Sequence, residues 1–326
     1  MITWPITLHD VINARRRIQP WLEATPLRHY PALDAAAGGG ISVLVKHENH
    51  NPTNAFKARN ALSVITALSP DEMRRGVVAA TRGNHGLGLA WACSLLGAPC
   101  TICVPVGNNP EKNEAIRAFG GALVEEGRDY DESVEVADRI VRERGCRLVH
   151  STNDPLVIAG AATITLEILD QATALDAMVI AVGGGSQAVG ALTVLKELKP
   201  EVEVYGVQAD RASAIHDSWR AGRAISKPSA DTFADGLATR NAYEMTFGTL
   251  REGLKDFITL SETEIAGGVR LLLRTTHNLA EGAGAAGLAG LIKLRDRLAG
   301  RRVAIILSGG NIDVATLRRV LNDEIR

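Results

Sequence analysis

One lysine in this chain stands in a setting suited to covalent chemistry. Lys57 follows Phe56, comes shortly after the turn-forming pair Asn51 and Pro52, and lies in a helical pattern near 56–68. Burial beside an aromatic side chain lowers the pKa of a lysine amine and leaves it nucleophilic, as Schiff-base formation with an aldehyde requires. Because most lysines are solvated surface groups, this interpretation depends on the other chemistry-bearing segments.

A glycine-rich segment has the composition of a phosphate-binding loop. Gly183, Gly184, Gly185 and Ser186 follow an apolar run and open a helical pattern. Successive glycines let backbone amides approach an anion without interference from Cβ atoms, and a helix N-terminus adds unpaired N–H groups and a positive dipole end. The alternative is a glycine-rich turn selected only for tight packing.

The same segment also fits a dinucleotide-binding pattern. Gly183, Gly185 and Ala188 match G-x-G-x-x-A, which requires an acidic residue about 20 positions further on to bind the ribose. Glu203 stands at that distance, but near the start of the next predicted strand rather than at its carboxyl end. A NAD-dependent dehydrogenase is therefore a second hypothesis, and it leaves Lys57 without a role.

Two more loops carry polar side chains at the ends of predicted strands. Thr81, Arg82, Asn84 and His85 follow one strand and lead into a helical pattern, and Ser308 follows another strand. Asn84 offers an amide, and Arg82 offers a guanidinium that can clamp a carboxylate. His85 is either a general base or a hydrogen-bonded structural histidine, and we favour the structural role.

Strand patterns alternate with helical patterns along almost the whole chain, and the strands are continuously apolar. This alternation predicts an α/β fold of parallel sheets covered by helices on both faces. Nine strands exceed a comfortable single core, so we expect two sheets in interleaved domains, with ligands bound at the carboxyl ends of the strands. The predicted strands are Ser42–Lys46, Gly76–Ala80, Cys100–Val106, Ala122–Glu125, Arg147–His150, Ala177–Val182, Val202–Val207, Asp256–Thr259 and Arg302–Leu307.

The composition limits the classes of partner. The chain has 326 residues, of which 46% are hydrophobic and 22% charged, and its net charge is −1; this is an ordinary globular balance. We expect no nucleic-acid or anionic-membrane partner, and no apolar run approaches the roughly 20 residues of a membrane span. The Met1–Pro5 segment lacks the features of an export signal, so we expect a cytoplasmic protein.

Cys100 and Cys103 have the spacing C-x-x-C, which can mark a redox pair or half of a metal site. No second pair or histidine cluster accompanies them. They lie in a predicted strand, where positions three apart face opposite sides. We therefore expect both to pack as small buried hydrophobes.

Together, the lysine, the glycine loop, the asparagine loop and the strand-end serine resemble the fold-type-II, or tryptophan-synthase-β-like, pyridoxal-phosphate (PLP) enzymes. The resemblance is greatest to threonine/serine dehydratases and serine racemase. It implies two interleaved α/β domains with the PLP site in the cleft between them: a large PLP-binding domain of 1–45 and 151–326, and a small inserted domain of 46–150. The segments that carry the resemblance are Asn51–Asn60, Thr81–Gly88, Gly183–Gln187 and Ser308–Asp313, supported by Val157–Gly160, Phe233–Gly236 and Glu281–Gly284.

The resemblance also implies a role for each site residue. Lys57 would bind PLP covalently and remove a substrate proton, Phe56 would pack behind the ring, and Ser308 would contact the pyridine nitrogen. The residues expected to hold the phosphate are Gly183, Gly184, Gly185 and Ser186. The residues expected around the substrate are Thr81, Arg82, Asn84 and His85, and Asn84 would also hydrogen-bond the phenolate oxygen of the cofactor.

By the same resemblance, the expected reaction is an α,β-elimination of water from a β-hydroxy amino acid of the threonine, serine or 3-hydroxyaspartate type. The products would be a 2-oxo acid and ammonia. A neutral Ser308 at the pyridine nitrogen leaves the ring a weaker electron sink, which favours elimination over transamination. Because we expect no appended regulatory domain, the expected role is catabolic; relatives in hydroxyectoine utilisation share this short architecture. Family precedent implies a homodimer.

The positions that depart most clearly from the family pattern are Asn54, Ala55, Asn60, Arg82 and Leu87, and the Arg82 position matters most. In serine-racemase-like members the Arg82 position holds a serine that acts as a second base. An arginine stays protonated near neutral pH and is a poor base, so an amino-acid racemase is the less favoured alternative. The guanidinium suggests a second substrate carboxylate as its partner, while an orientation toward solvent or an internal carboxylate is equally compatible with the sequence.

We expect no metal requirement. Racemase-like relatives hold a divalent cation after the strand that here ends at Val207, but Gln208, Ala212 and Ala214 stand where its ligands would fall, and such cations need carboxylate oxygens. A catalytically idle amino-acid-binding protein is the last alternative. The intact Lys57 and glycine loop count against it.

Overall fold

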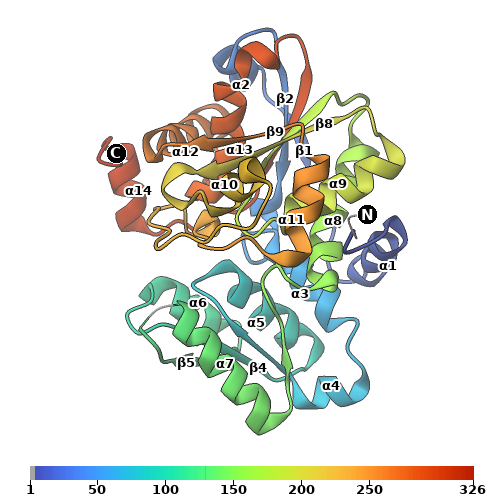
Figure 1. Ribbon diagram of the computed structural model, residues 1–326, viewed down its shortest axis with the longest axis vertical. Helices are drawn as coiled ribbons and strands as arrows, with labels where there is room; N and C mark the ends of the chain where they lie inside the picture. The colour runs from blue at the N-terminus through green and yellow to red at the C-terminus, as the bar shows by residue number, and fades with distance from the viewer. Residues whose placement is uncertain (1–3, 129) are drawn as a thin grey trace.

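The chain folds into two lobes, each built on its own sheet (Figure 1). This computed structural model describes residues 4–128 and 130–326. Residues 1–3, which belong to the segment where we see no export signal, lie outside the described residues, as does Asp129. The described strands form a six-stranded sheet with the order β1-β2-β10-β7-β8-β9 and a four-stranded sheet with the order β5-β4-β3-β6.

Within the described residues, all strand pairings are parallel except that of β1 (Leu27–His29) with β2 (Ser42–His47). The prediction of an α/β fold with mostly parallel sheets is therefore confirmed. The other strands of the large sheet are β7 (Ala177–Ala181), β8 (Glu203–Ala209), β9 (Asp256–Leu260) and β10 (Arg302–Leu307), and those of the small sheet are β3 (Val77–Ala80), β4 (Cys100–Val104), β5 (Ala122–Glu125) and β6 (Arg147–Leu148).

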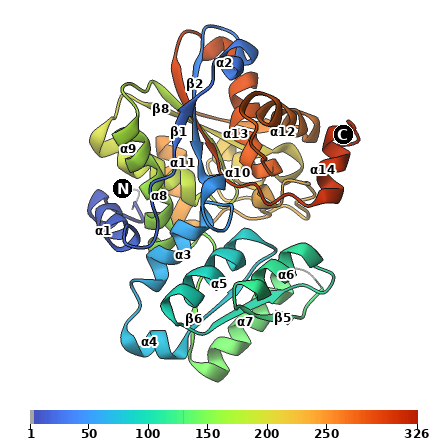
Figure 2. The same cartoon turned by 180° about the vertical axis from the view of Figure 1, so that it is seen from behind.

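Helices cover both sheets (Figures 1 and 2). No helix of the described residues is long and apolar enough to cross a membrane. The α-helices are α1 (Leu8–Ile18), α2 (Pro31–Ala37), α3 (Lys57–Ile65), α4 (Pro70–Arg75), α5 (Asn84–Leu96), α6 (Pro110–Ala118), α7 (Tyr130–Arg144), α8 (Pro155–Gln171), α9 (Ser186–Leu198), α10 (Ala214–Ala221), α11 (Glu244–Gly253), α12 (Glu262–Thr276), α13 (Gly282–Lys293) and α14 (Val314–Leu321); the short 3₁₀ turns include η1 (Glu48–His50) and η3 (Asp235–Leu237).

The starts of several helices follow from local sequence. The Asp154 side chain accepts a hydrogen bond from the Leu156 N–H, and Pro155 occupies the first position of α8, where its missing N–H costs nothing. Ser69 and Ser261 form capping boxes at α4 and α12 with the acidic residue three positions on. These caps fix where the chain turns from a loop into a helix at the edges of the two sheets.

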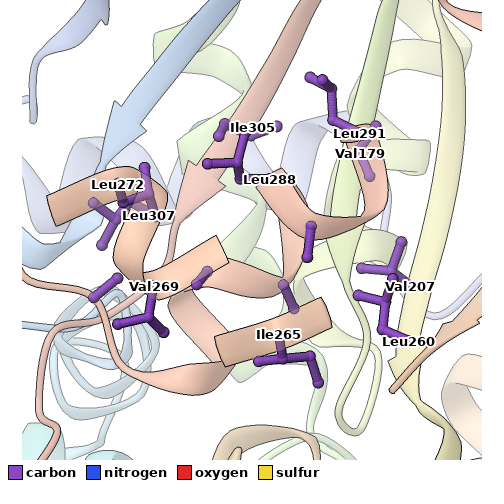
Figure 3. Packing of buried hydrophobic residues seen from close by; sticks show 14 of the residues in the cluster. Val179, Val207, Leu260, Ile265, Val269, Leu272, Leu288, Leu291, Ile305 and Leu307 are labelled. Carbon is purple, nitrogen blue, oxygen red and sulfur yellow. The ribbon is translucent and has the colours of Figure 1, made fainter. Parts of the chain in front are cut away.

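The large sheet buries an apolar cluster on each face. One face packs against α12 and α13, as Figure 3 shows for Val179 and Ile305 of the sheet opposite Leu288 and Leu291 of α13. The other face packs against α8 and α9. Branched apolar side chains on both faces explain why these strands are continuously hydrophobic.

The small sheet also has two buried clusters, and they separate the two cysteines of the C-x-x-C spacing. Cys100 belongs to the cluster under α3 and α5, and Cys103 belongs to the cluster under α7. Both are free and buried. The prediction that they pack on opposite sides of a strand is therefore confirmed.

Helix α3 lies at the junction of the two lobes in both views (Figures 1 and 2). A Cβ atom on Gly88 of α5 would lie 2.7 Å from the Lys57 carbonyl oxygen, and one on Gly160 of α8 would lie 2.6 Å from the Arg59 carbonyl oxygen. The first turn of α3 is thus in backbone contact with a helix of each lobe. Strand β2 of the large sheet runs through His47, two positions past the expected boundary at 45, and the domain boundaries stay a prediction.

Candidate active site

Lys57 is the first residue of α3, and the segment before it is held against the end of β10. The Phe56 N–H donates to the Ser308 carbonyl oxygen at 2.9 Å, and the Gly310 N–H donates to the Asn54 carbonyl oxygen at 2.9 Å. These two bonds bring Lys57 beside Ser308, although the motifs that contain them lie near opposite ends of the chain.

The Lys57 amine is poorly solvated. Its Nζ lies 4.8 Å from the centre of the Phe56 ring and donates to the Ser151 carbonyl oxygen at 2.9 Å. Burial lowers the pKa of Lys57 to about 8. At pH 7 roughly 10% of the amine is therefore neutral, against about 0.03% for a solvated lysine, so Lys57 is equipped to act as a nucleophile and a base.

The loop between β7 and α9 contains three glycines because only backbone fits there. A Cβ atom on Gly183 would lie 2.0 Å from the Gly236 carbonyl oxygen, and one on Gly184 would lie 2.0 Å from Thr152 Oγ1. Gly185 has a φ of 102°, which disfavours any residue with a side chain. The glycines therefore let the backbone of this loop face the cavity directly.

The start of α9 has donors that no group of the described residues uses. Within the described chain no side chain caps this helix at Gly185, before Ser186. The Gln187 side chain is buried, and its Nε2 has no hydrogen-bond partner among the described residues. Free backbone N–H groups, the helix dipole and an unpartnered amide together fit an anion such as a phosphate group.

The loop between β3 and α5 brings the predicted substrate residues to the same place. Thr81 Oγ1 accepts a hydrogen bond from the Gly83 N–H at 3.1 Å, which shapes the turn. The Arg82 side chain is exposed, and in the described chain it makes no hydrogen bond or ion pair. His85 is buried, and its ring N–H at Nε2 donates to the Val149 carbonyl oxygen at 2.9 Å.

His85 is unsuited to carrying a second ring proton near neutral pH. Burial and, after it, the nearby Lys57 charge lower the pKa of His85 to about 3. Its Nδ1 has no partner among the described residues. The neutral ring can therefore offer Nδ1 as a hydrogen-bond acceptor, and the favoured structural role of this histidine agrees with its bond to Val149.

Asn84 is held in one orientation by two neighbours. Asn311 Nδ2 donates both to the Thr53 carbonyl oxygen and to Asn84 Oδ1, each at 2.8 Å. Because a backbone carbonyl can only accept, this fixes the Asn311 amide and hence the Asn84 amide. Asn84 Nδ2 then donates to Glu281 Oε1 at 2.7 Å and retains a second N–H for a ligand.

Glu281 is an acid with a strongly perturbed proton affinity. Burial raises the pKa of Glu281 to about 7; the Lys112 charge opposes this shift, and the Asp235 charge reinforces it. Lys112 on α6 and Asp235 in η3 form an ion pair across the two lobes. Glu281 and the Lys112–Asp235 ion pair therefore lie on the cavity wall close to Asn84.

Every predicted site residue lines one cavity of about 330 Å³. The cavity lies between the lobes, since its walls come from the carboxyl ends of strands in both sheets. The predicted residues on its wall are Phe56, Lys57, Thr81, Arg82, Asn84, His85, Gly183, Gly184, Gly185, Ser186 and Ser308.

Sequence reasoning missed several residues of the same wall. Gln187 lies inside a quoted motif and Glu281 in a supporting stretch, but neither was given a role. Asn311 also lies in a quoted motif and was given no role; it fixes the Asn84 amide from outside this wall. Lys112 and Tyr243 lie in no motif, and only the folded chain brings them to the cavity. Spacing alone offered no pattern that could have found these two.

The requirement of the dinucleotide hypothesis is not met. Glu203 is the first residue of β8, and its carboxylate accepts hydrogen bonds from Tyr205 and Arg301. Hydrogen bonds from Lys255, the strongest contributor, and from Tyr205 and Arg301 lower the pKa of Glu203 to about 2. This carboxylate is committed to the opposite end of the strand from the glycine loop, so it cannot bind a ribose there.

A family model for pyridoxal-phosphate dependent enzymes matches residues 18–309. The chain belongs to this family. It is 38% identical to an L-threonine ammonia-lyase of Thermotoga maritima, over 97% of this chain and 78% of the relative. It is 32% identical to an L-threo-3-hydroxyaspartate ammonia-lyase of a Pseudomonas species, over 94% of this chain and 95% of the relative.

The fold is similar to the solved structure of maize serine racemase, with a TM-score of 0.92, 28% identity and coverage of 98% of each chain. These findings confirm three predictions: the fold-type-II PLP family, PLP as the cofactor, and an enzyme of the threonine-dehydratase-like ammonia-lyase type. The dehydrogenase hypothesis is wrong. The roles assigned to individual residues stay predictions.

Proposed function

We propose that this PLP-dependent enzyme removes water from a β-hydroxy amino acid and releases a 2-oxo acid and ammonia. The observation that carries the proposal is the convergence on one cavity of a desolvated Lys57, an uncapped glycine loop and a strand-end Ser308. The relatives that act on threonine and 3-hydroxyaspartate support this reaction class.

The chain's own residues fit the cofactor. The unpartnered Gln187 amide and the backbone of Gly183–Gly185 suit its phosphate, Lys57 suits its aldehyde, and the second N–H of Asn84 suits its phenolate oxygen. Bound PLP withdraws electrons from the α-carbon of an attached amino acid, which makes the α-proton removable. Ser308, a neutral hydroxyl at the cavity wall, would leave the ring uncharged at its nitrogen.

Lys57 is the base that this arrangement supplies. With a pKa of about 8, its amine can take a proton from the α-carbon and return it to a leaving hydroxyl. Its hydrogen bond to the Ser151 carbonyl oxygen holds the amine in place without neutralising it. The α-proton and the β-hydroxyl leave together as water. Hydrolysis by another water molecule then releases the amino group as ammonia.

Arg82 supports a substrate with a second carboxylate. Its guanidinium lines the cavity, is exposed, and has no partner in the described part of the chain. A carboxylate on the β-carbon side of the substrate would provide a charge-assisted partner for it. A β-hydroxy dicarboxylic amino acid of the 3-hydroxyaspartate type is therefore favoured over threonine as the preferred substrate.

The same residue argues against efficient racemisation. Exchange of configuration needs a second base on the face opposite Lys57. The guanidinium of an arginine is a poor base near neutral pH, and His85, with a pKa of about 3, binds a second ring proton too weakly to act as a base. Elimination is the outcome that one base supports.

We also propose that the protein is a cytoplasmic homodimer. Its four cysteines are free and buried, as expected in a reducing compartment. Two apolar side chains of α14 are exposed, Val314 by 73% and Leu321 by 46%, and such a face is suited to a second copy of the chain. Light scattering of the purified protein tests the dimer, and a monomer at micromolar concentration would contradict it.

The experiment for the reaction class uses the purified, PLP-loaded protein. L-threonine, L-serine and L-threo-3-hydroxyaspartate are supplied separately, and ammonia and 2-oxo acid are quantified. Equal amounts of both products from at least one compound are expected. Loss of substrate without ammonia would contradict the proposal.

A further inference from the structure

Four charged side chains lie buried together behind the first turn of α3. They are Lys46 of β2, Glu48 of η1, Arg59 of α3 and Glu167 of α8, here called the charge cluster. Their exposed fractions are 0%, 0%, 1% and 7%. None of them lines the cavity, so the proposed reaction leaves them unexplained.

Arg59 is the centre of the charge cluster. Its Nε and Nη2 donate to the two oxygens of Glu48 at 2.7 and 2.9 Å, and its Nη1 and Nη2 donate to the two oxygens of Glu167 at 2.6 and 2.7 Å. Two bidentate pairs hold a planar guanidinium in both direction and rotation.

Lys46 completes the charge cluster. Its Nζ donates to Glu167 Oε2 and to the Thr25 carbonyl oxygen, each at 2.6 Å. Two cations thus face two carboxylates, and the charge sums to zero. Burial, the largest single influence, raises the pKa of Glu48, but Arg59, Lys46 and Thr25 together lower it by more, so this carboxylate stays ionised in the folded protein.

Stability is a weak explanation for such an arrangement. Removing four charges from water is costly, and replacing a buried ion pair with apolar side chains of similar volume is often neutral or stabilising. Buried charges with several directional bonds do specify a geometry, as networks that are fully satisfied become rigid. The charge cluster is therefore better explained by the geometry that it specifies for the elements it joins.

Arg59 joins the start of α3 to elements of the large lobe. Arg59 lies two residues after Lys57, and the other members of the charge cluster belong to β2, η1 and α8, which all pack with or belong to the large sheet. The glycine loop and Ser308 stand at the ends of strands of that same sheet. The charge cluster thus ties the start of α3 to the lobe that carries the proposed phosphate and ring contacts.

The Phe56–Ser308 backbone bond holds the residue before α3, but the closest helix contacts of the first turn do little to fix the direction of the helix. Gly160 of α8 and Gly88 of α5 present bare backbone to it, so no side chain there interlocks with the helix. Sliding of α3 along these smooth surfaces would carry the Lys57 amine away from its place. Directional bonds from Arg59 prevent that movement.

We propose that Arg59 is a positioning residue, and that the charge cluster fixes the first turn of α3 so that the Lys57 amine points at the glycine loop and Ser308. The inference rests on the proposed role of Lys57. Arg59 and its partners touch neither the substrate nor the cofactor, and they act through the backbone of α3.

The test compares two charge-neutral double variants of the full-length protein. Lys46→Met/Glu167→Met removes one pair of the charge cluster and leaves Arg59 bound to Glu48. Arg15→Met/Asp170→Met removes a pair between α1 and α8 whose side chains are 31% and 53% exposed, and it serves as the matched control. Each protein is stripped of PLP with hydroxylamine, and the rate of PLP capture is followed by absorbance from pH 6 to 10.

The charge-cluster variant is expected to melt within a few degrees of the control but to capture PLP at least about tenfold more slowly at pH 7, because small misplacements of a reacting group have large effects on rate. The pH of half-maximal capture should rise from about 8, the pKa of Lys57 in the intact protein. A merely structural cluster would lower the melting temperature and leave this midpoint unchanged. Equal rates and midpoints in both variants would overturn the inference.

Two further measurements keep the outcomes distinct. If the double variant does not fold, Arg59→Lys replaces it; this variant keeps the charge but loses the bidentate pairs, and capture as fast as in the unmodified protein would overturn the inference. Borohydride reduction and mass spectrometry of the unmodified protein then show which lysine carries PLP. An adduct on a residue other than Lys57 would refute the proposed role of Lys57 itself, whatever the variants show.

Discussion

The Phe56 backbone N–H donates to the Ser308 carbonyl oxygen at 2.9 Å. This single bond joins the residue before the proposed catalytic lysine to the residue proposed to contact the cofactor ring nitrogen. It means that Lys57 and Ser308 keep a fixed separation set by backbone rather than by flexible side chains. The site is therefore organised on the large sheet, and the Thr81–His85 loop approaches it from the small sheet.

PLP capture by the PLP-free protein should depend on pH through Lys57. Since burial lowers the pKa of Lys57 to about 8, the capture rate should be half-maximal at about pH 8 and level off above it. A rate that keeps rising to pH 10 would show an ordinary, solvated lysine. Lys57→Ala should capture no PLP covalently, and stopped-flow absorbance measures both proteins.

Gly184→Ala should weaken PLP binding at least about tenfold, because a donor loop that has moved loses charge-assisted bonds. The added Cβ would lie 2.0 Å from Thr152 Oγ1, so the loop must shift. Gly267→Ala is the matched control, since its Cβ would meet nothing closer than 4.0 Å. Titration with PLP measures the affinity, and unchanged affinity in Gly184→Ala would remove the loop from the phosphate site.

Glu281 should make the PLP-free protein less stable as the pH rises through about 7. The folded protein holds a proton on Glu281 up to about pH 7, above its ordinary value of 4.5, so the stabilising contribution is complete below pH 4.5 and is lost as the pH passes 7. Melting temperatures at pH 5 to 9 should therefore fall less steeply for Glu281→Gln.

Glu143→Gln, whose side chain is 59% exposed, is the control for that measurement. It should follow the unmodified protein at every pH. If Glu281→Gln also follows it, the pKa of Glu281 is not raised in the folded protein.

Arg82→Ala should reduce kcat/KM for 3-hydroxyaspartate by roughly 10- to 100-fold and change kcat/KM for threonine less than about threefold, because one charge-assisted hydrogen bond contributes about 1.5–3 kcal/mol. Arg82→Lys should recover part of the loss. Arg117→Ala, an exposed arginine of α6 outside the cavity, is the control. Equal losses for both substrates would remove the second carboxylate from the account.

Incubation of the PLP-loaded protein with L-serine should give pyruvate and ammonia with no accumulation of D-serine. The reason is that Arg82 and His85 cannot serve as the second base near neutral pH. Chiral chromatography of the remaining serine measures this. A D-serine yield comparable to the pyruvate yield would favour the racemase alternative.

Local patterns predicted the parts of the site that local chemistry determines. Gly183, Gly184 and Gly185 were found because a strand, a glycine run and a helix are consecutive in the sequence. The predicted strand 100–106 ends at Val104, since Pro105 has no N–H to continue the ladder. Helix α4 was missed because it buries no residue, which leaves no apolar periodicity.

Long-range partnerships were beyond the sequence. Lys112 and Asp235 meet across the lobes, and Arg59 meets Glu48 and Glu167 in the core. Each of these residues alone resembles a solvated charge, and only the packing of α3, α6 and α8 brings the pairs together. Strand β1, three residues long and antiparallel, likewise had too few residues to show an alternating pattern.

The most direct test of the central claim is the visible absorption spectrum of the purified protein with PLP, recorded before and after addition of L-threo-3-hydroxyaspartate, L-threonine or L-serine, with Lys57→Ala alongside. The account predicts a lysine-bound PLP band that the variant lacks, a change in that band with at least one amino acid, and release of ammonia with a 2-oxo acid. An unmodified protein that acquires no such band with excess PLP would contradict the account.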